Sequence, residues 1–579
     1  MKTLKSITNF LVKWTCTTNH KQIGILYILF GGFAGGIGTG FSLVILLELT
    51  LPGNSSFGFK SELYNILTYF HGFIMVYFFV MPFLIGGFGS LMIPTLLRIP
   101  DVAYPYLNKF SFCLWVLSVC LAFSAVLLGD ADMNWTAYLP FSGVEGQSSS
   151  VTLVIYSAYL AAASLFLMTI NVIATAITIR PEGITLFRIP LPVWAFFLMS
   201  VLLVPSIFII GCVFPLLDFA YSEDSNPPGS VEESVVFTIL NSLLNSQTIC
   251  AIILPTFGII SHVIITSSPK KPSPHLLGPF LSMAWISLSC PLSLGFELFC
   301  AMKGCQGLEE LYLIMYLLYY GCIPVMLAVP SWMIALWSVP KFKTSLLCIL
   351  GSVFSLIIGV LASAAIWLSP EIGLILNSTF YSVAVCHYNS FIPPVFAIFA
   401  GFYYWFEELW GIKYNEFLGR LHFVLLFVGV NITFFPIYVI GWYGKPNNTS
   451  PVNFGPHSEL ITHLCELSSI GSAISIVGIL VFFVMLCHAF YYRKPVGLYD
   501  PIKELTGKSA GITDPERQAQ IHSAFNKSQV TYIAYTEESI KNFRSEQRRT
   551  PNHPFVVFVF WCFLCSLCSL VYWLWQYWF

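Results

Sequence analysis

The sequence consists largely of apolar blocks, most of them roughly 20 residues or longer, which shorter polar stretches separate. A block of this length can cross the hydrocarbon core of a bilayer as an α-helix. Only 9% of the 579 residues are charged, whereas a soluble domain carries about 25%. So few charges cannot cover a water-facing surface. We therefore predict an all-α integral membrane protein.

Thirteen of the blocks are candidate membrane spans. Several contain glycine or proline, which membrane helices tolerate when neighbouring groups satisfy the freed backbone. The candidate spans lie near residues 23–50, 63–96, 109–128, 151–179, 190–217, 234–266, 278–302, 311–338, 345–368, 379–408, 419–441, 467–491 and 554–578.

The last eighty-odd residues differ in composition from the rest of the chain. Residues 495–553 are the longest polar stretch and predict a surface segment on the inner side of the membrane. Residues 554–579 are rich in tryptophan and tyrosine, which favour the membrane interface, and contain the thirteenth span. Three cysteines, Cys562, Cys565 and Cys568, share one face of that helix, which favours helix packing over metal binding.

Basic residues recur in alternate loops. The loops between them are acidic or nearly neutral, with Lys303 and Lys445 as the main exceptions. The positive-inside rule then places the N-terminus on the cytoplasmic or matrix side. The net charge of −1 gives no reason to expect nucleic-acid binding. The basic loops carry Lys21, Arg98, Arg180, Lys270, Lys341, Lys413 and Arg493, among others.

Two histidines fall deep inside apolar spans, His71 in the second and His387 in the tenth. Ionisable side chains inside a bilayer are costly, so each is a candidate functional residue. A neutral imidazole can bind a metal or a haem iron. The alternative is an imidazole that only bonds to a helix carbonyl, and composition alone does not decide. Residues near span ends are expected to face water or to be satisfied locally: Glu48, Asp101, His262 and His422.

Several motifs, in the same order and with the same spacing, resemble subunit I of cytochrome c oxidase and of the haem–copper respiratory oxidase family. Four of the clearest are Thr17-Thr-Asn-His-Lys-Gln-Ile-Gly, His71-Gly-Phe-Ile-Met-Val, Pro82-Phe-Leu-Ile-Gly-Gly-Phe-Gly and Gly429-Val-Asn-Ile-Thr-Phe-Phe-Pro. The resemblance covers about residues 15–495. It implies the family's twelve-helix bundle over residues 1–494, to which this chain adds the segment 495–553 and the span in 554–579.

The resemblance also implies a haem site. In the family, a low-spin haem is bound by one histidine of helix two and one of helix ten, and His71 and His387 match these positions. A single low-spin haem held by this pair is therefore expected. Its type stays open, because the arginine that contacts the haem's formyl group in the family corresponds to Leu46.

The ligands of the family's oxygen-reducing site do not carry over. The high-spin haem ligand in the family's Ala-His-Phe-His-Tyr corresponds to Val385. The family's His-Pro-Glu-Val-Tyr corresponds to the stretch from Ser246 to Cys250, and counting without gaps puts its adjacent copper-binding histidines at Phe299 and Cys300. A lysine of one proton channel corresponds to Ala328. The resemblance therefore predicts no active-site copper, although cysteines in the vacated region could in principle bind a soft metal.

Supporting positions of the family are also replaced. The histidine–aspartate pair near the haem propionates corresponds to Asn377 and Ser378, and the propionate-binding arginine pair to Asn447 and Asn448. Asp101 and Asn108 match the entrance of the second proton channel, where a further family asparagine corresponds to Ser90.

Three hypotheses follow. The chain binds one bis-histidine haem for electron transfer without reducing oxygen; or it is a haem-free structural paralogue that packs in a membrane complex; or it is an active terminal oxidase with a non-standard site. Whether it is itself an enzyme stays open. The family resemblance implies subunit II- and subunit III-like partners or other respiratory-complex subunits. A bacterial inner membrane and a mitochondrial inner membrane both fit.

Overall fold

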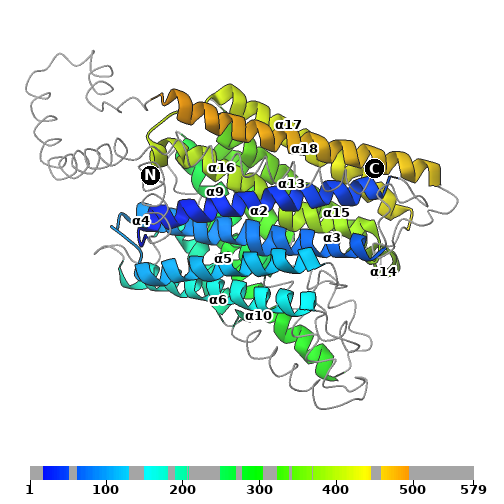
Figure 1. Ribbon diagram of the computed structural model, residues 1–579, viewed down its shortest axis with the longest axis horizontal. Coiled ribbons are helices and arrows are strands. Elements are labelled where there is room, and N and C mark those ends of the chain that lie inside the picture. Colours follow the sequence, from blue (N-terminus) through cyan, green and yellow to red (C-terminus); the bar gives the residue numbers. More distant parts are fainter. Residues whose placement is uncertain are drawn as a thin grey trace, which may run out of the picture. The chain divides into compact units, whose positions relative to one another are not determined.

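The computed structural model of the chain describes residues 17–50, 61–128, 149–179, 189–204, 206–207, 248–268, 277–303, 322–337, 339, 342–367, 370–444 and 458–494. Within these ranges the regular elements are helices, as the sequence predicts (Figure 1). They are α2 (His20–Glu48), α3 (Ser61–Phe73), η1 (Ile74–Val80), η2 (Pro82–Gly89), α4 (Ser90–Leu97), α5 (Pro105–Leu128), α6 (Ser149–Thr178), α9 (Thr248–Ser267), α10 (Leu277–Lys303), α12 (Ile323–Leu336), α13 (Thr344–Trp367), α14 (Pro370–Asn377), α15 (Phe380–Cys386), η6 (His387–Phe391), α16 (Ile392–Trp410), α17 (Glu416–Trp442) and α18 (Ser458–Tyr492).

Nine helices in the described ranges are long and apolar enough to cross a membrane. They coincide with the predicted spans one to four, six and nine to twelve. Three shorter apolar helices, Leu191–Val204, Leu277–Leu292 and Ile323–Leu336, fall where spans five, seven and eight are predicted. The polar segment 495–553 and the thirteenth span lie outside the described residues. The multi-pass membrane architecture is thus confirmed, whereas the thirteenth span stays a prediction.

The chain divides into two compact units. The larger comprises residues Met1–Tyr404, Glu416–Phe482 and Ser566–Phe579 and contains every residue of the site described below. The smaller comprises Trp405–Asn415 and Phe483–Cys565. Within the smaller unit, the Lys413 N–H donates to the Lys494 carbonyl at 2.8 Å.

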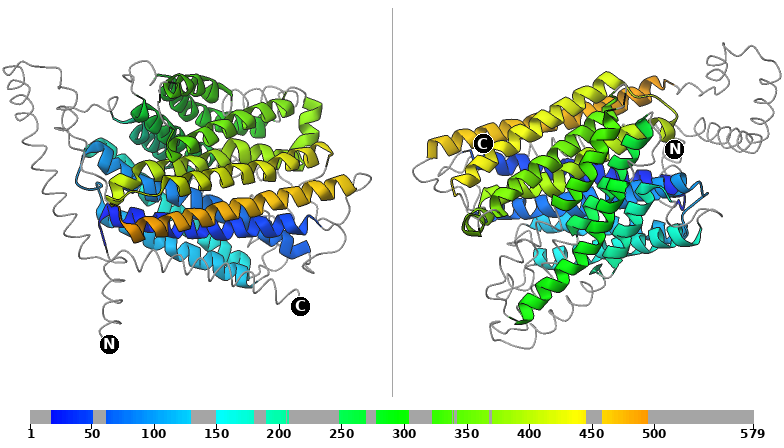
Figure 2. Two further views of the ribbon diagram at one scale, coloured as in Figure 1. Left: turned by 90° about the horizontal axis from the view of Figure 1, so that it is seen from above. Right: turned by 180° about the vertical axis from the view of Figure 1, so that it is seen from behind.

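In the larger unit, α2 packs closely along the helical run from Ser61 to Leu97 (Figures 1 and 2). Glycines of α2 face this run: a Cβ on Gly35 would lie 2.7 Å from the Phe79 ring. Small residues let membrane helices bring their backbones together, which compensates for the weak hydrophobic driving force within lipid.

The middle of this run is π-helical, in η1 and η2. Pro82 offers a local cause. Its ring would clash with the carbonyl four residues earlier in a regular α-helix, and it has no N–H to donate. Wider turns relieve that clash, and π-helical turns in natural helices are frequent near functional sites.

Helices α5 and α6 are joined by a ladder of serines. Ser118 Oγ donates to the Ser157 carbonyl at 2.6 Å, and Ser157 Oγ donates back to the Ser118 carbonyl at 2.8 Å. Seven residues along each helix, Ser164 Oγ donates to the Ser111 carbonyl at 2.7 Å. Two turns of helix separate these two sets of serine hydrogen bonds, so both sets lie on one contact between α5 and α6.

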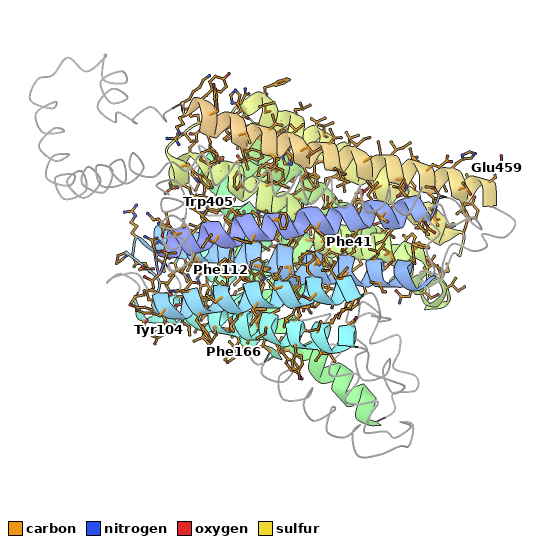
Figure 3. All side chains as sticks on the ribbon, viewed as in Figure 1. Phe41, Tyr104, Phe112, Phe166, Trp405 and Glu459 are labelled. Atoms are coloured by element: carbon orange, nitrogen blue, oxygen red, sulfur yellow. The ribbon has the colours of Figure 1, made fainter. Side chains whose placement is uncertain are left out.

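Helix α5 also packs against α2. Phe112 of α5, labelled in Figure 3, meets Tyr27 of α2 edge to face, with the ring centres 5.0 Å apart.

The ladder predicts that Ser118→Ala and Ser157→Ala each destabilise the protein, because each removes one interhelical hydrogen bond to a backbone carbonyl. We expect a loss of about 0.5–1.5 kcal/mol for each substitution, as for other interhelical bonds in membranes. Unfolding of the purified protein by SDS in mixed micelles would measure it. Ser124→Ala is the matched control, because Ser124 Oγ bonds only its own helix, at the Cys120 carbonyl. Losses no larger than that of Ser124→Ala would contradict the ladder.

Candidate functional site: the His71–His387 pair

His71 and His387 come from helices more than 300 residues apart in sequence, and both adjoin π-helical turns. His71 lies in the last turn of α3, just before η1, and His387 is the first residue of η6. The helix before His387 starts at a defined point, since the Thr379 side chain accepts a hydrogen bond from the Tyr381 N–H. The local backbone thus fixes where each imidazole leaves its helix.

The structure brings the two imidazoles close together in the larger unit, with nearly parallel planes. Their ring centres are 6.5 Å apart and their planes are inclined by only 14°. Two imidazoles bound to opposite sides of one metal place their ring centres roughly 6 Å apart, because each metal–nitrogen bond is about 2 Å long. The spacing is therefore that of a shared metal rather than of direct ring contact.

Hydrogen bonds fix the tautomer of each ring. His71 Nδ1 lies 2.8 Å from the Gly38 carbonyl oxygen, and His387 Nδ1 lies 2.7 Å from the Val383 carbonyl oxygen. A carbonyl can only accept, so each Nδ1 carries the hydrogen and each Nε2 keeps its lone pair. Metal-bound histidines commonly donate their other ring N–H to a carbonyl in this way.

Gly38 can reach His71 because it has no side chain. A Cβ at this position would lie 2.7 Å from Met75 Sδ and 3.4 Å from Ile74 Cγ2. The glycine thus allows α2 to approach closely enough for its carbonyl to accept from His71. Gly38 was not among the site residues predicted from the sequence, although the glycine-rich stretch of α2 is the signal for such a close approach.

Aromatic rings line the His387 side of the pair. The Phe434 ring centre lies 4.5 Å from that of His387, and the Phe391 ring centre lies 5.6 Å away. The neighbouring Tyr388 hydroxyl donates to Asn431 Oδ1 at 2.7 Å, and Asn431 Nδ2 donates to the Phe427 carbonyl at 2.7 Å. These polar groups bond to one another and to the backbone beside the pair.

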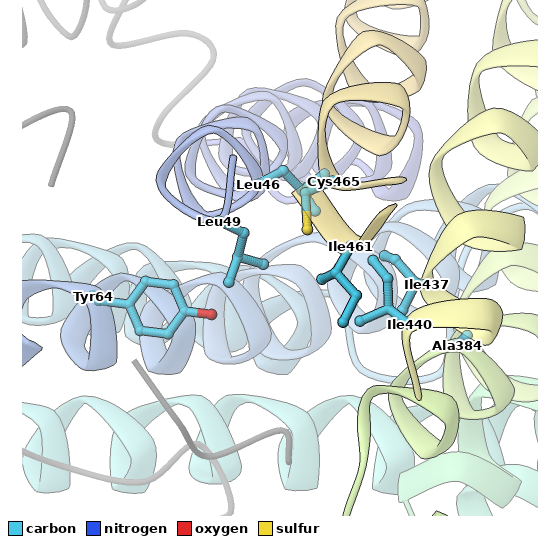
Figure 4. Close-up of a cluster of buried hydrophobic side chains, with 8 residues drawn as sticks. All are labelled: Leu46, Leu49, Tyr64, Ala384, Ile437, Ile440, Ile461 and Cys465. Atoms are coloured by element: carbon cyan, nitrogen blue, oxygen red, sulfur yellow. The ribbon is translucent and has the colours of Figure 1, made fainter. Parts of the chain in front are cut away.

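Val385, two residues before His387, lies in an apolar cluster with Ile366, Leu376 and Tyr381. The next residue back, Ala384, belongs to a different cluster that also contains Leu46 (Figure 4). The two residues of α15 that lie two and three positions before His387 therefore pack into two separate apolar clusters.

The other positions matched to the family's oxygen-reducing site are only partly described. Ala328 is fully buried in α12, and the buried Cys250 thiol shares a hydrogen bond with Cys290. Phe299 and Cys300 lie in α10, but their side chains are not described, and Ser246 lies outside the described residues. Across the described part of the chain, no group of three or more histidine, cysteine, aspartate or glutamate side chains could hold a metal ion.

Polar residues near the span ends behave differently from one another. Asp101 is partly exposed and pairs with His20 at 2.9 Å, and Asn108 bonds to Ser90. Glu48 is only 4% exposed, so of the two expected alternatives it does not face water; it is buried at the end of α2. His422, also expected near a span end, is fully buried and lies 3.0 Å from the Tyr403 hydroxyl through Nδ1.

Comparisons with known proteins agree with this architecture. The family described as Cytochrome C and Quinol oxidase polypeptide I matches residues 22–474. Cytochrome c oxidase subunit 1 of Eremothecium gossypii is 31% identical over 483 residues, which cover 82% of this chain and 88% of that protein. A heme-copper terminal oxidase dimer solved by cryo-electron microscopy shares the fold, with a TM-score of 0.62 and 17% identity over 82% of this chain and 83% of that one.

The Gly38 contact yields a prediction. Gly38→Val should force α2 away from His71 and destabilise the protein by about 1–3 kcal/mol through overpacking. Gly32→Val is the control on the same helix, because a Cβ on Gly32 meets nothing within 4 Å. Both changes add the same side chain, so the difference in their free energies of unfolding isolates the close approach. Equal values would show that α2 does not depend on it.

Proposed function

Because the chain belongs to the Cytochrome C and Quinol oxidase polypeptide I family, we propose that it is a respiratory membrane subunit that binds one low-spin haem between His71 and His387. In this proposal the haem transfers electrons, and the chain does not itself reduce oxygen. The observation that carries the proposal is the pair of nearly parallel imidazoles with ring centres 6.5 Å apart.

The residues present fit such a haem. Each imidazole donates through Nδ1 to a backbone carbonyl, which leaves the Nε2 lone pair of each ring available to hold a haem iron. A haem bound there would supply one-electron chemistry. The chain's part is to hold the two rings apart at a fixed spacing and, through rings such as that of Phe434, to keep water away.

The second half of the proposal, that oxygen is not reduced, rests on the positions equated with the family's other ligands. Valine cannot bind iron, and Val385 packs among aliphatic and aromatic side chains. A copper centre of the family type needs imidazole ligands, and the matched positions hold Ser246, Phe299 and Cys300 instead. Ala328 likewise offers no group that could carry a proton.

A second candidate is a haem-free structural paralogue. The apolar packing of Leu46 favours it, because that position contacts the haem's formyl group in the family and here belongs to a closed cluster with Leu49 and Tyr64. A third candidate, an active terminal oxidase with a non-standard site, is favoured by family membership alone. In all three cases we propose subunit II- and subunit III-like partners or other respiratory subunits.

We also propose that the protein resides in a bacterial or mitochondrial inner membrane, with its N-terminus on the cytoplasmic or matrix side. The support is the alternation of basic and acidic loops along the sequence. The segment 495–553 would then lie on the inner side, between the twelve-helix bundle and the last span.

An optical spectrum of the dithionite-reduced protein tests the proposal. We expect a sharp low-spin haem band that carbon monoxide leaves unchanged, because His71 and His387 would both hold the iron. His71→Ala should abolish that band, whereas His262→Ala should retain it, since His262 lies against Tyr404 and apart from the pair. A carbon monoxide shift in the unaltered protein would mean an open iron site and favour the oxidase. A stable protein without any haem band would favour the structural paralogue.

A further inference from the structure

A series of aromatic rings connects His387 with one end of helix α17. Successive ring centres lie 4.5 Å (His387–Phe434), 6.2 Å (Phe434–Tyr388), 5.6 Å (Tyr388–Tyr438), 5.1 Å (Tyr438–Tyr381) and 6.2 Å (Tyr381–Trp442) apart. All of these rings belong to the larger unit.

The series runs from the buried interior to the surface of the bundle at the end of α17. Tyr388 is fully buried and Tyr381 is 7% exposed, whereas Trp442, the last residue of α17, is 59% exposed. The histidine pair lies closer to this end of the bundle, where α3 begins and α17 ends, than to the opposite end. His71 follows the start of α3 by only ten residues, or about 15 Å of helix.

Aromatic contacts by themselves prove little, because 16% of the residues are aromatic and rings pack readily in apolar interiors. Two features distinguish this series. It starts at His387, which belongs to the histidine pair and packs against Phe434, and it ends at an exposed indole at the nearer end of the bundle. Electron tunnelling rates fall exponentially with the gaps between donor and acceptor orbitals, so a run of contacting π-systems is a favourable medium.

We propose that Trp442, Tyr381, Tyr438, Tyr388 and Phe434 form the path by which an external one-electron carrier reduces the haem held by His387. This inference rests on the proposed function, since it assumes that haem. One electron leaves the carrier, which is oxidised, and ferric iron is reduced to ferrous. No bond forms or breaks, and no proton moves.

The hydrogen bonds of the tyrosines favour tunnelling through them over their oxidation. The Tyr388 hydroxyl donates to Asn431 Oδ1, and the Tyr381 hydroxyl donates to the Ala362 carbonyl at 3.0 Å. Amide oxygens are very weak bases, so neither can take the proton that a tyrosine loses when it becomes a neutral radical. The phenols therefore stay reduced, and the rings act as a medium rather than as stations.

The path also suggests its own matched control. The Tyr438 hydroxyl has no hydrogen-bond partner among the described residues, so Tyr438→Phe keeps the ring and removes little else. Tyr438→Leu removes the π-system from the middle of the path. If Tyr438 only filled space, Tyr438→Phe and Tyr438→Leu would reduce the haem at the same rate whenever both variants keep the unaltered haem spectrum.

The test is laser flash photolysis with a water-soluble ruthenium tris-bipyridine complex as electron donor, in which the growth of the reduced haem band is followed. We expect Tyr438→Leu and Trp442→Leu to slow haem reduction several-fold, and Tyr438→Phe to leave it unchanged. Trp337→Leu should also have no effect, because this exposed indole at the end of α12 is not part of the series. The haem midpoint potential is titrated in each variant, so that a change in driving force is recognised.

The outcomes separate this inference from the proposed function. If the unaltered protein shows no haem band, the proposed function fails. If the band is present and Tyr438→Leu reduces at the unaltered rate, or Tyr438→Phe is slowed equally, the path alone is overturned. A slowing that the measured potential accounts for also overturns it. Should Tyr438→Leu fail to fold, Tyr381→Leu interrupts the same path one ring further out.

Discussion

Water is absent from the hydrocarbon core of a bilayer, so the chain must satisfy its own polar groups there. Many of its serine and threonine hydroxyl groups do so by bonding to carbonyls of their own helix or of a neighbour, as Ser118 and Ser157 do between α5 and α6. The histidines obey the same rule, each through one nitrogen. An imidazole has two nitrogens, and the hydrogen bond to the carbonyl uses only Nδ1. Nε2 of His71 and Nε2 of His387 therefore each keep a lone pair.

A carbonyl bond does not by itself distinguish a haem ligand from a histidine that is merely accommodated in a helix bundle. His422, whose Nδ1 faces the Tyr403 hydroxyl, shows that this chain also buries a histidine away from the pair. What sets His71 and His387 apart is their mutual geometry. Two rings that simply pack would lie in direct contact. These two rings are nearly parallel, but their centres are 6.5 Å apart, which leaves room for a metal ion between them.

The sequence was sufficient to predict where the described spans lie and which two histidines would meet, because apolar blocks and long motifs are one-dimensional signals. It did not predict the π-helical turns at 74–89 and 387–391, the role of Gly38, or the burial of Glu48. Each of these depends on how closely two helices approach. A span can be recognised from its own residues, but the register of one helix against another is a property of both surfaces.

The packing around α15 bears on how such a chain stays folded whether or not a cofactor is bound. Ala384 and Val385 face two separate apolar clusters, one with Leu46 and one with Leu376. Polar ligands at such positions would depend on a metal to offset their desolvation in this apolar setting. Apolar side chains there need no such partner and stabilise the helix contacts through van der Waals packing, which drives the association of helices in membranes. The helix contacts around His387 therefore need no metal ligand at Ala384 or Val385.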